Sequence, residues 1–186
     1  MQTLGISEAP DRSEGRLKSL FWPSIQNATD VDYLGSQGFW ICTVVAVLAL
    51  GTVVARGQMF SALAAFLFYW VGGMGVRERS RYAASIVFVM WGLDVMLQPG
   101  ILKVIVAGLL LSNLRATWIA ARWKPESEEA VRPPRFADTW SDKLADQWPM
   151  IIWPKVRILY YLFSAGFLVM VVIGLAVLAG RAARVG

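Results

Sequence analysis

The one acid and the one lysine inside the long apolar stretches have the clearest capacity for chemistry. Asp94 and Lys103 flank the pair Pro99-Gly100. Because proline and glycine break helices, two antiparallel helices should meet there and bring both side chains to a similar depth. An ionisable group inside a bilayer is costly and is a functional candidate by default. We expect a structural ion pair; the alternatives are a proton or ion path, or two side chains that do not meet.

A second group of chemically capable residues is the segment WVGGMGVRERSR, residues 70–81, where three glycines precede Arg77, Arg79 and Arg81. Glycines expose backbone N–H groups, and a guanidinium can bind phosphate with two parallel hydrogen bonds. These three arginines are therefore a candidate contact for an anionic lipid headgroup. The alternative is the end of a helix followed by charges that only set orientation. A nucleotide site is disfavoured, because no P-loop lysine pattern is present.

A stripe of small residues recurs every four positions at Gly108, Ser112, Ala116 and Ala120. On a helix these positions share one face and allow another backbone to come close. We expect this stripe to pack against the chain's own helices, with an outside partner as the alternative.

Enzyme signatures are missing. The sequence has no histidine and a single cysteine, which removes the commonest metal ligand and the usual general base. It contains no G-x-S-x-G, H-E-x-x-H or C-x-x-C motif. We therefore predict no catalytic site, no metal and no cofactor, although a bound lipid, quinone or carotenoid stays compatible with the sequence. The net charge of +5 calls for no nucleic acid, because membrane topology accounts for it.

The elements that would position these residues are long apolar runs. Hydrophobic residues make up 56% of the 186, above the 45–50% of typical soluble domains. The runs predict an all-α integral membrane protein, a bundle of about five transmembrane helices. The expected spans are 38–55, 59–75, 82–98, 101–121 and 158–180.

Orientation follows from the basic residues. With the N-terminus in the cytoplasm, 14 of the 18 Lys and Arg residues lie on the inner side, as the positive-inside rule requires. Residues 1–37 and 122–157 are then cytoplasmic, and residues 181–186 form a tail outside. Two amphipathic helices, 14–22 and 139–148, are expected to lie in the plane of the membrane on the cytoplasmic side. The compact layout favours the bacterial inner membrane.

Tryptophans give a second indication of depth, because indole rings prefer the headgroup level. We expect seven of them to be interfacial anchors: Trp22, Trp40, Trp118, Trp123, Trp140, Trp148 and Trp153. In DQWPMIIWPKVR, residues 146–157, Pro149 should end the surface helix and Pro154 should open the last span. This predicts a corner between a helix on the membrane and a helix through it.

These observations favour a small non-enzymatic membrane protein, an accessory, assembly or scaffold subunit of a larger membrane complex. Membrane lipids and other membrane subunits, or a second copy of the chain, are the expected partners. The alternative is a small transporter, channel or lipid-handling protein that uses Asp94 and Lys103 or the Arg77–Arg81 turn.

Overall fold

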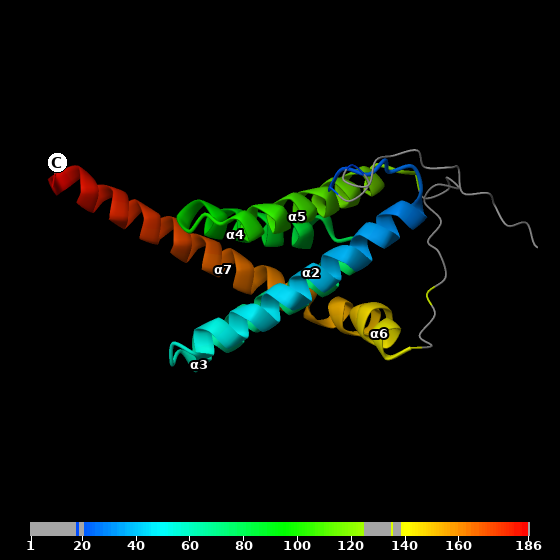
Figure 1. Cartoon of the computed structure of the whole chain (residues 1–186), viewed down its shortest axis with the longest axis horizontal. Coiled ribbons are helices and arrows are strands. Elements are labelled where there is room, and N and C mark those ends of the chain that lie inside the picture. Colours follow the sequence, from blue (N-terminus) through cyan, green and yellow to red (C-terminus); the bar gives the residue numbers. More distant parts are fainter. Residues whose placement is uncertain (1–17, 19–20, 125–134, 136–138, 186) are drawn as a thin grey trace, which may run out of the picture.

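The computed structural model describes residue 18, residues 21–124, residue 135 and residues 139–185 (Figure 1). This part of the chain is helical and contains no strand. The helices are α2 (Ala28–Val54), α3 (Met59–Arg77), α4 (Arg81–Leu97), α5 (Ile101–Ala120), α6 (Trp140–Asp142), the π-helix η2 (Lys143–Gln147) and α7 (Trp148–Val185).

Four of these helices are long and apolar enough to cross a membrane, which is consistent with an integral membrane protein. They cover Ala28–Gly51, Met59–Arg77, Ile101–Ala120 and Lys143–Gly174. The expected count of five is therefore corrected to four. The helix left out is α4, whose 17 residues extend about 25 Å at 1.5 Å per residue. That length falls short of the roughly 30 Å hydrocarbon core of a bilayer.

Helix α2 begins ten residues before its apolar run. Helix α2 starts at Ala28 rather than at residue 38, because the side chain of Asn27 caps it by accepting a hydrogen bond from the backbone N–H of Asp30, 3.0 Å away. Its polar first turns stay helical because Asp32 has a charged partner on α3. The hydropathy pattern alone could not predict the Asn27 cap or the ion pair between Asp32 and Arg77.

The predicted corner at Pro149 is wrong. Helix η2 runs directly into α7, which continues for 38 residues with Pro154 inside it. Pro149 is buried in the first turn of α7, where a missing N–H costs little. The segment 139–148 is therefore the beginning of the last helix rather than a separate surface helix. Most of the other expected surface helix, 14–22, lies outside the described residues.

Short connections join α2 to α3, α3 to α4 and α4 to α5. Gly57, with φ +75°, closes the turn between α2 and α3, a left-handed conformation that glycine adopts without strain. Ser80 caps α4 by accepting a hydrogen bond from the backbone N–H of Ala83. As a result, α2 and α3 form one hairpin and α4 and α5 another, and α7 crosses the first hairpin (Figure 1).

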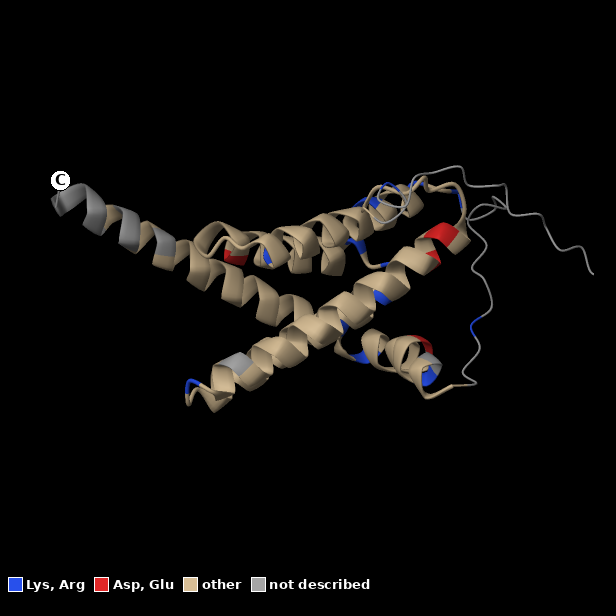
Figure 2. Ribbon diagram, in the orientation of Figure 1, with Lys and Arg blue, Asp and Glu red and all other residues tan. Residues whose placement is uncertain are grey.

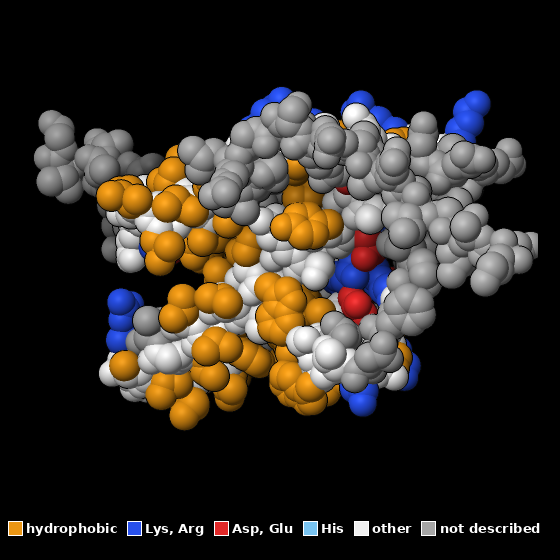
Figure 3. Space-filling view, turned by 45° about the vertical axis from the view of Figure 1, so that its right-hand side comes forward, with side chains coloured by type: hydrophobic (Ala, Val, Ile, Leu, Met, Phe, Trp, Pro, Cys, Tyr) orange, Lys and Arg blue, Asp and Glu red, His pale blue; other side chains and the backbone are white. Residues whose placement is uncertain are grey.

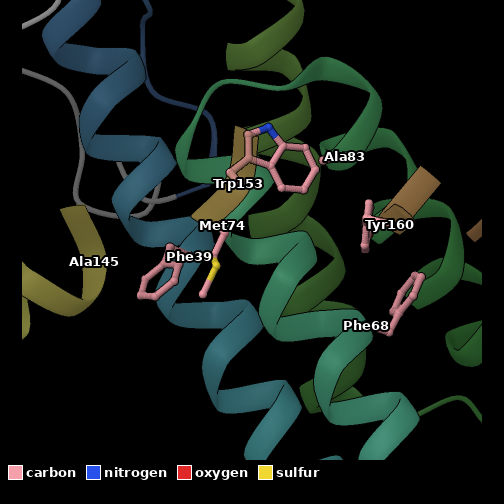
Figure 4. Close-up of a cluster of buried hydrophobic side chains, with 7 residues drawn as sticks. All are labelled: Phe39, Phe68, Met74, Ala83, Ala145, Trp153 and Tyr160. Atoms are coloured by element: carbon pink, nitrogen blue, oxygen red, sulfur yellow. The ribbon is translucent and has the colours of Figure 1, made fainter. Parts of the chain in front are cut away.

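The largest buried cluster lies where α7 meets α2, α3 and α4 (Figure 4). Its members are Phe39, Phe68, Met74, Ala83, Ala145, Trp153 and Tyr160. The glycines of α3 make this contact possible. A Cβ on Gly75 would lie 2.5 Å from both Ala83 Cβ and Trp153 Cη2, and a Cβ on Gly72 would lie 2.6 Å from the hydroxyl oxygen of Tyr160. The glycine-rich stretch is thus a packing surface for α4 and α7.

Candidate functional site

Charged residues gather at the end of the molecule where α2 begins and α6 lies, while the middles of the helices are almost free of them (Figure 2). The centre of this group is Arg77, the last residue of α3, whose side chain is 3% exposed. Its guanidinium lies between carboxylates from two other elements. Nε donates to Asp146 Oδ1 at 2.9 Å, and Nη2 donates to Asp32 Oδ2 at 2.8 Å. Arg77 Nη1 also donates to the backbone carbonyl of Asp32.

Further charges surround this centre. Arg135, which follows α5 in the chain, donates to Glu78 and, at 3.3 Å, to Asp32 Oδ1. Arg79 donates to the backbone carbonyl of Ala28, and its Nη2 lies 3.6 Å from Asp32 Oδ1. We call Asp32, Arg77, Glu78, Arg79, Arg135 and Asp146 the Arg77 network. It holds three carboxylates and three guanidiniums, so its formal charges cancel. Acidic and basic side chains meet in this way on the face shown in Figure 3.

The network fastens four parts of the chain that lie far apart in sequence: the start of α2, the end of α3, residue 135 and η2. The π-helix has a direct role, because Asp146 belongs to it. A π-turn takes up one more residue than an α-turn and so changes the directions of the side chains within it. In η2, the Asp146 side chain points toward Arg77, and the preceding residue, Ala145, is buried.

This geometry corrects the expected lipid contact at Arg77 and Arg79. Both side chains are at most 9% exposed, and both face carboxylates of the chain itself. A guanidinium that is neutralised in this way does not reach a headgroup. Arg81 differs, because its hydrogen bond goes to the hydroxyl of its neighbour Tyr82, and its guanidinium lies over the rings of Tyr82 and Trp118.

The structure brings Asp94 and Lys103 together. Lys103 Nζ lies 2.7 Å from Asp94 Oδ2, with side-chain exposures of 29% and 42%. The indole N–H of Trp91 donates to the backbone carbonyl of Lys103 at 2.9 Å, so α4 and α5 are joined beside the pair by a second polar contact. The partial exposure of both charges fits an ion pair that holds the hairpin.

The small-residue stripe of α5 faces the chain's own residues. Ser112 and Ala116 are buried, and Ala116 and Ala120 pack with Val31 and Leu34 of α2. A Cβ on Gly108 would lie 3.2 Å from the ring of Phe21. The neighbouring Asn113 is 1% exposed, and its Oδ1 occupies the space that a Cβ on Gly38 would need. In this structure the stripe serves internal packing.

The seven tryptophans divide into two groups. Five are at least 37% exposed, as a ring at a membrane surface would be: Trp22, Trp40, Trp118, Trp140 and Trp148. Trp123 is half-buried and packs beside Val31 and Leu34. Trp153 is 6% exposed and packs edge to face with Tyr160 and Tyr161. Its predicted role as an interfacial anchor is corrected, because its ring points into the bundle through the space left by Gly75.

Sequence reasoning missed four members of the network: Asp32, Glu78, Arg135 and Asp146. One signal was available. In the predicted topology all four lie on the same side of the membrane as Arg77 and Arg79, and carboxylates at the ends of apolar helices are candidates for burial beside arginines. Treating the arginines only as topology charges hid that pairing.

The chemistry open to this site is limited. Each carboxylate of the Arg77 network accepts a hydrogen bond from a guanidinium, so none is poised as a general base. Within the described ranges, no group of three or more His, Cys, Asp or Glu residues is placed to hold a metal ion. The arrangement is suited to fixing helices relative to one another.

Comparison of the chain with known protein families, with characterised proteins and with solved structures gives no match.

Proposed function

We propose that this chain is a non-enzymatic integral membrane protein that serves as an accessory, assembly or scaffold subunit of a larger membrane complex. In this proposal it lies in a bacterial inner membrane with its N-terminus in the cytoplasm. The Arg77 network then lies at the cytoplasmic end and fixes the angle at which α7 leaves the bundle. The observation that carries the proposal is the exposure of apolar side chains on the outer part of α7, residues 165–174.

This part of α7 packs little inside the chain, apart from a tilted contact between the rings of Phe167 and Phe68 of α3, whose centroids lie 6.4 Å apart. Only 11% of the apolar window of that span is buried, against 39%, 39% and 28% for the other three spans. The last buried side chain of α7 whose surroundings are described is Ser164. Beyond it Val169, Met170 and Val172 are 57–71% exposed. In Figure 1 this part of the helix runs away from the α2–α3 hairpin.

Two features favour a helix of another subunit over lipid alone as its cover. Gly166 and Gly174 lie on α7, and a Cβ at either position would meet nothing within 4 Å. Glycines on an open helix surface let a second backbone approach closely, which is how helices associate in membranes. The inner part of α7, in contrast, is held firmly by the aromatic cluster and by Asp146. A helix that is packed firmly at its inner part and exposed at its outer part is suited to dock against another subunit.

Site-specific photo-crosslinking in native membranes tests the proposal. A crosslinking residue at Met170 should give one discrete protein adduct. The same residue at Leu102 of α5, which is 67% exposed, is the matched control and should give lipid adducts. Lipid adducts alone at both positions would contradict the proposal.

A second candidate, a small transporter or channel, is supported by the ion pair between Asp94 and Lys103. Replacing both residues together, Asp94→Asn with Lys103→Met, separates the two candidates. If assembly survives and a proton flux into liposomes, followed with a pH-sensitive dye, is lost, the transport function holds. If the wild type carries no such flux, this candidate fails.

A further inference from the structure

Arg81 is held differently from the other two arginines of its turn. Its guanidinium carbon lies 4.9 Å from the centre of the Tyr82 ring and 5.3 Å from the centre of the Trp118 ring. One of its nitrogens donates to the Tyr82 hydroxyl at 3.1 Å. Among the described residues, no carboxylate pairs with it. Arg81 is thus a cation fixed on an aromatic surface with donors left over.

The rings beneath Arg81 are themselves held in place. The Trp118 indole N–H donates to Ser85 Oγ, and Ser85 Oγ donates to the backbone carbonyl of Arg81. The Tyr82 ring packs edge to face on Tyr161 of α7. Both rings remain partly open, with Tyr82 56% and Trp118 41% exposed. The surface around Arg81 is therefore ordered before any ligand arrives.

More positive charge lies along α5. Arg115, one turn before Trp118, packs over the ring of Trp22 at 4.5 Å and donates to the carbonyl of Pro23. Arg122 follows the end of α5 and is exposed. Neither arginine has a carboxylate partner in the part of the chain that the structure describes. Arg81, Tyr82 and Trp118 contact one another, and Arg115 and Arg122 come three residues before and four residues after Trp118 in the chain. We call these five residues the Arg81 surface.

We propose that the Arg81 surface binds the headgroup of an anionic phospholipid. Helix ends that carry exposed Trp and Tyr lie at headgroup depth in a membrane, and a guanidinium offers parallel N–H donors that match phosphate oxygens. Stacking on two rings fixes the plane of the Arg81 guanidinium, so less freedom is lost when a phosphate binds. Arg115 and Arg122 add attraction for a net negative headgroup.

The charge balance at this end of the molecule gives the reason for choosing an anionic occupant. The Arg77 network cancels its own charge, whereas the Arg81 surface contains three arginines and no acid. A neutral zwitterionic lipid would leave that excess uncompensated. Surface cations of this kind contribute about 1 kcal/mol each to binding an anionic membrane, which corresponds to about fivefold in affinity.

Native mass spectrometry of the full chain, with defined lipids added, provides the test. Wild type should retain phosphatidylglycerol in preference to phosphatidylcholine. Arg81→Gln should weaken phosphatidylglycerol binding about fivefold. Arg56→Gln is the matched control, because Arg56 is an exposed arginine in the turn between α2 and α3, and it should bind like wild type.

Three results would overturn the proposal: equal retention of the two lipids by wild type, unchanged binding in Arg81→Gln, or displacement of the lipid by inorganic phosphate, which would indicate a site for free anions. If Arg81→Gln does not fold, Arg81→Lys replaces it. Lysine keeps the positive charge but lacks the two parallel N–H donors of the guanidinium. A decrease of at least twofold in phosphatidylglycerol affinity therefore supports the proposal, and unchanged affinity contradicts it. Neither variant touches residues 165–174 of α7, so loss of lipid with intact subunit crosslinking separates this inference from the proposed function.

Discussion

Replacing Arg77 by methionine should destabilise the protein by about 3 kcal/mol, because it leaves a carboxylate without its cation in a nearly buried place. Arg77 makes four hydrogen bonds to Asp32 and Asp146. Asp146 has no other cation among the described residues, and its side chain is 19% exposed. Asp32 keeps Arg135 at 3.3 Å and Arg79 at 3.6 Å.

The expected loss in free energy of unfolding follows from these contacts of Asp32 and Asp146. Breaking a buried ion pair from one side costs about 3–5 kcal/mol. One of the two carboxylates here keeps other partners, and the second is partly solvated, so the lower end of that range applies. Methionine fills a similar volume with apolar atoms and limits the loss of packing. Adding Asp146→Asn removes the unpaired charge and should recover about 1–2 kcal/mol.

The assay is reversible unfolding in mixed micelles with increasing SDS, followed by helical circular dichroism. Arg56→Met, in the exposed turn between α2 and α3, is the control and should stay within about 0.5 kcal/mol of wild type. A cost below about 1 kcal/mol for Arg77→Met would refute the reasoning. So would an additive rather than compensating effect of Asp146→Asn.

Two further substitutions test packing and capping in the same unfolding assay. Gly75→Ala should cost about 1–3 kcal/mol, because its Cβ would lie 2.5 Å from Ala83 Cβ. Gly51→Ala, with nothing within 4 Å, should be neutral or slightly stabilising, and equal effects at the two sites would contradict the close contact. Ser80→Ala should cost about 1–2 kcal/mol, because it removes both the cap of α4 and the hydrogen bond to the Tyr161 hydroxyl. A change within about 0.3 kcal/mol would show that neither bond is formed.

The hydropathy pattern was sufficient to predict the helical class and the positions of α3, α4 and α5, because their bounds follow the ends of the apolar runs, although α4 proved too short to count as a span. The turn at Pro99-Gly100 also predicted which two helices would bring Asp94 and Lys103 near each other, and the structure places them 2.7 Å apart. Helix-breaking residues and helical spacing in the sequence were therefore enough to predict this ion pair.

The charge network could not be reached in the same way. Asp32 and Arg77 are 45 residues apart, and Arg77 and Asp146 are 69 apart. Their pairing depends on how two hairpins and α7 pack, which no local pattern encodes. The early start of α2 has this origin in part, since Asp32 in its polar first turns pairs with Arg77 of α3, while the Asn27 cap is a local contact. Trp153 was misplaced because its depth depends on Gly75, a residue on another helix.

The central claim is that α7 joins this chain to another membrane subunit, and the mass of the intact particle tests it most directly. The chain alone weighs 20.6 kDa. Native mass spectrometry of material released gently from its own membrane should show a stoichiometric complex that contains this chain and at least one more polypeptide. Replacing Gly166 and Gly174 together by leucine should dissociate that complex while the isolated chain stays folded. A single, monodisperse species of 20.6 kDa from the wild type would contradict the account.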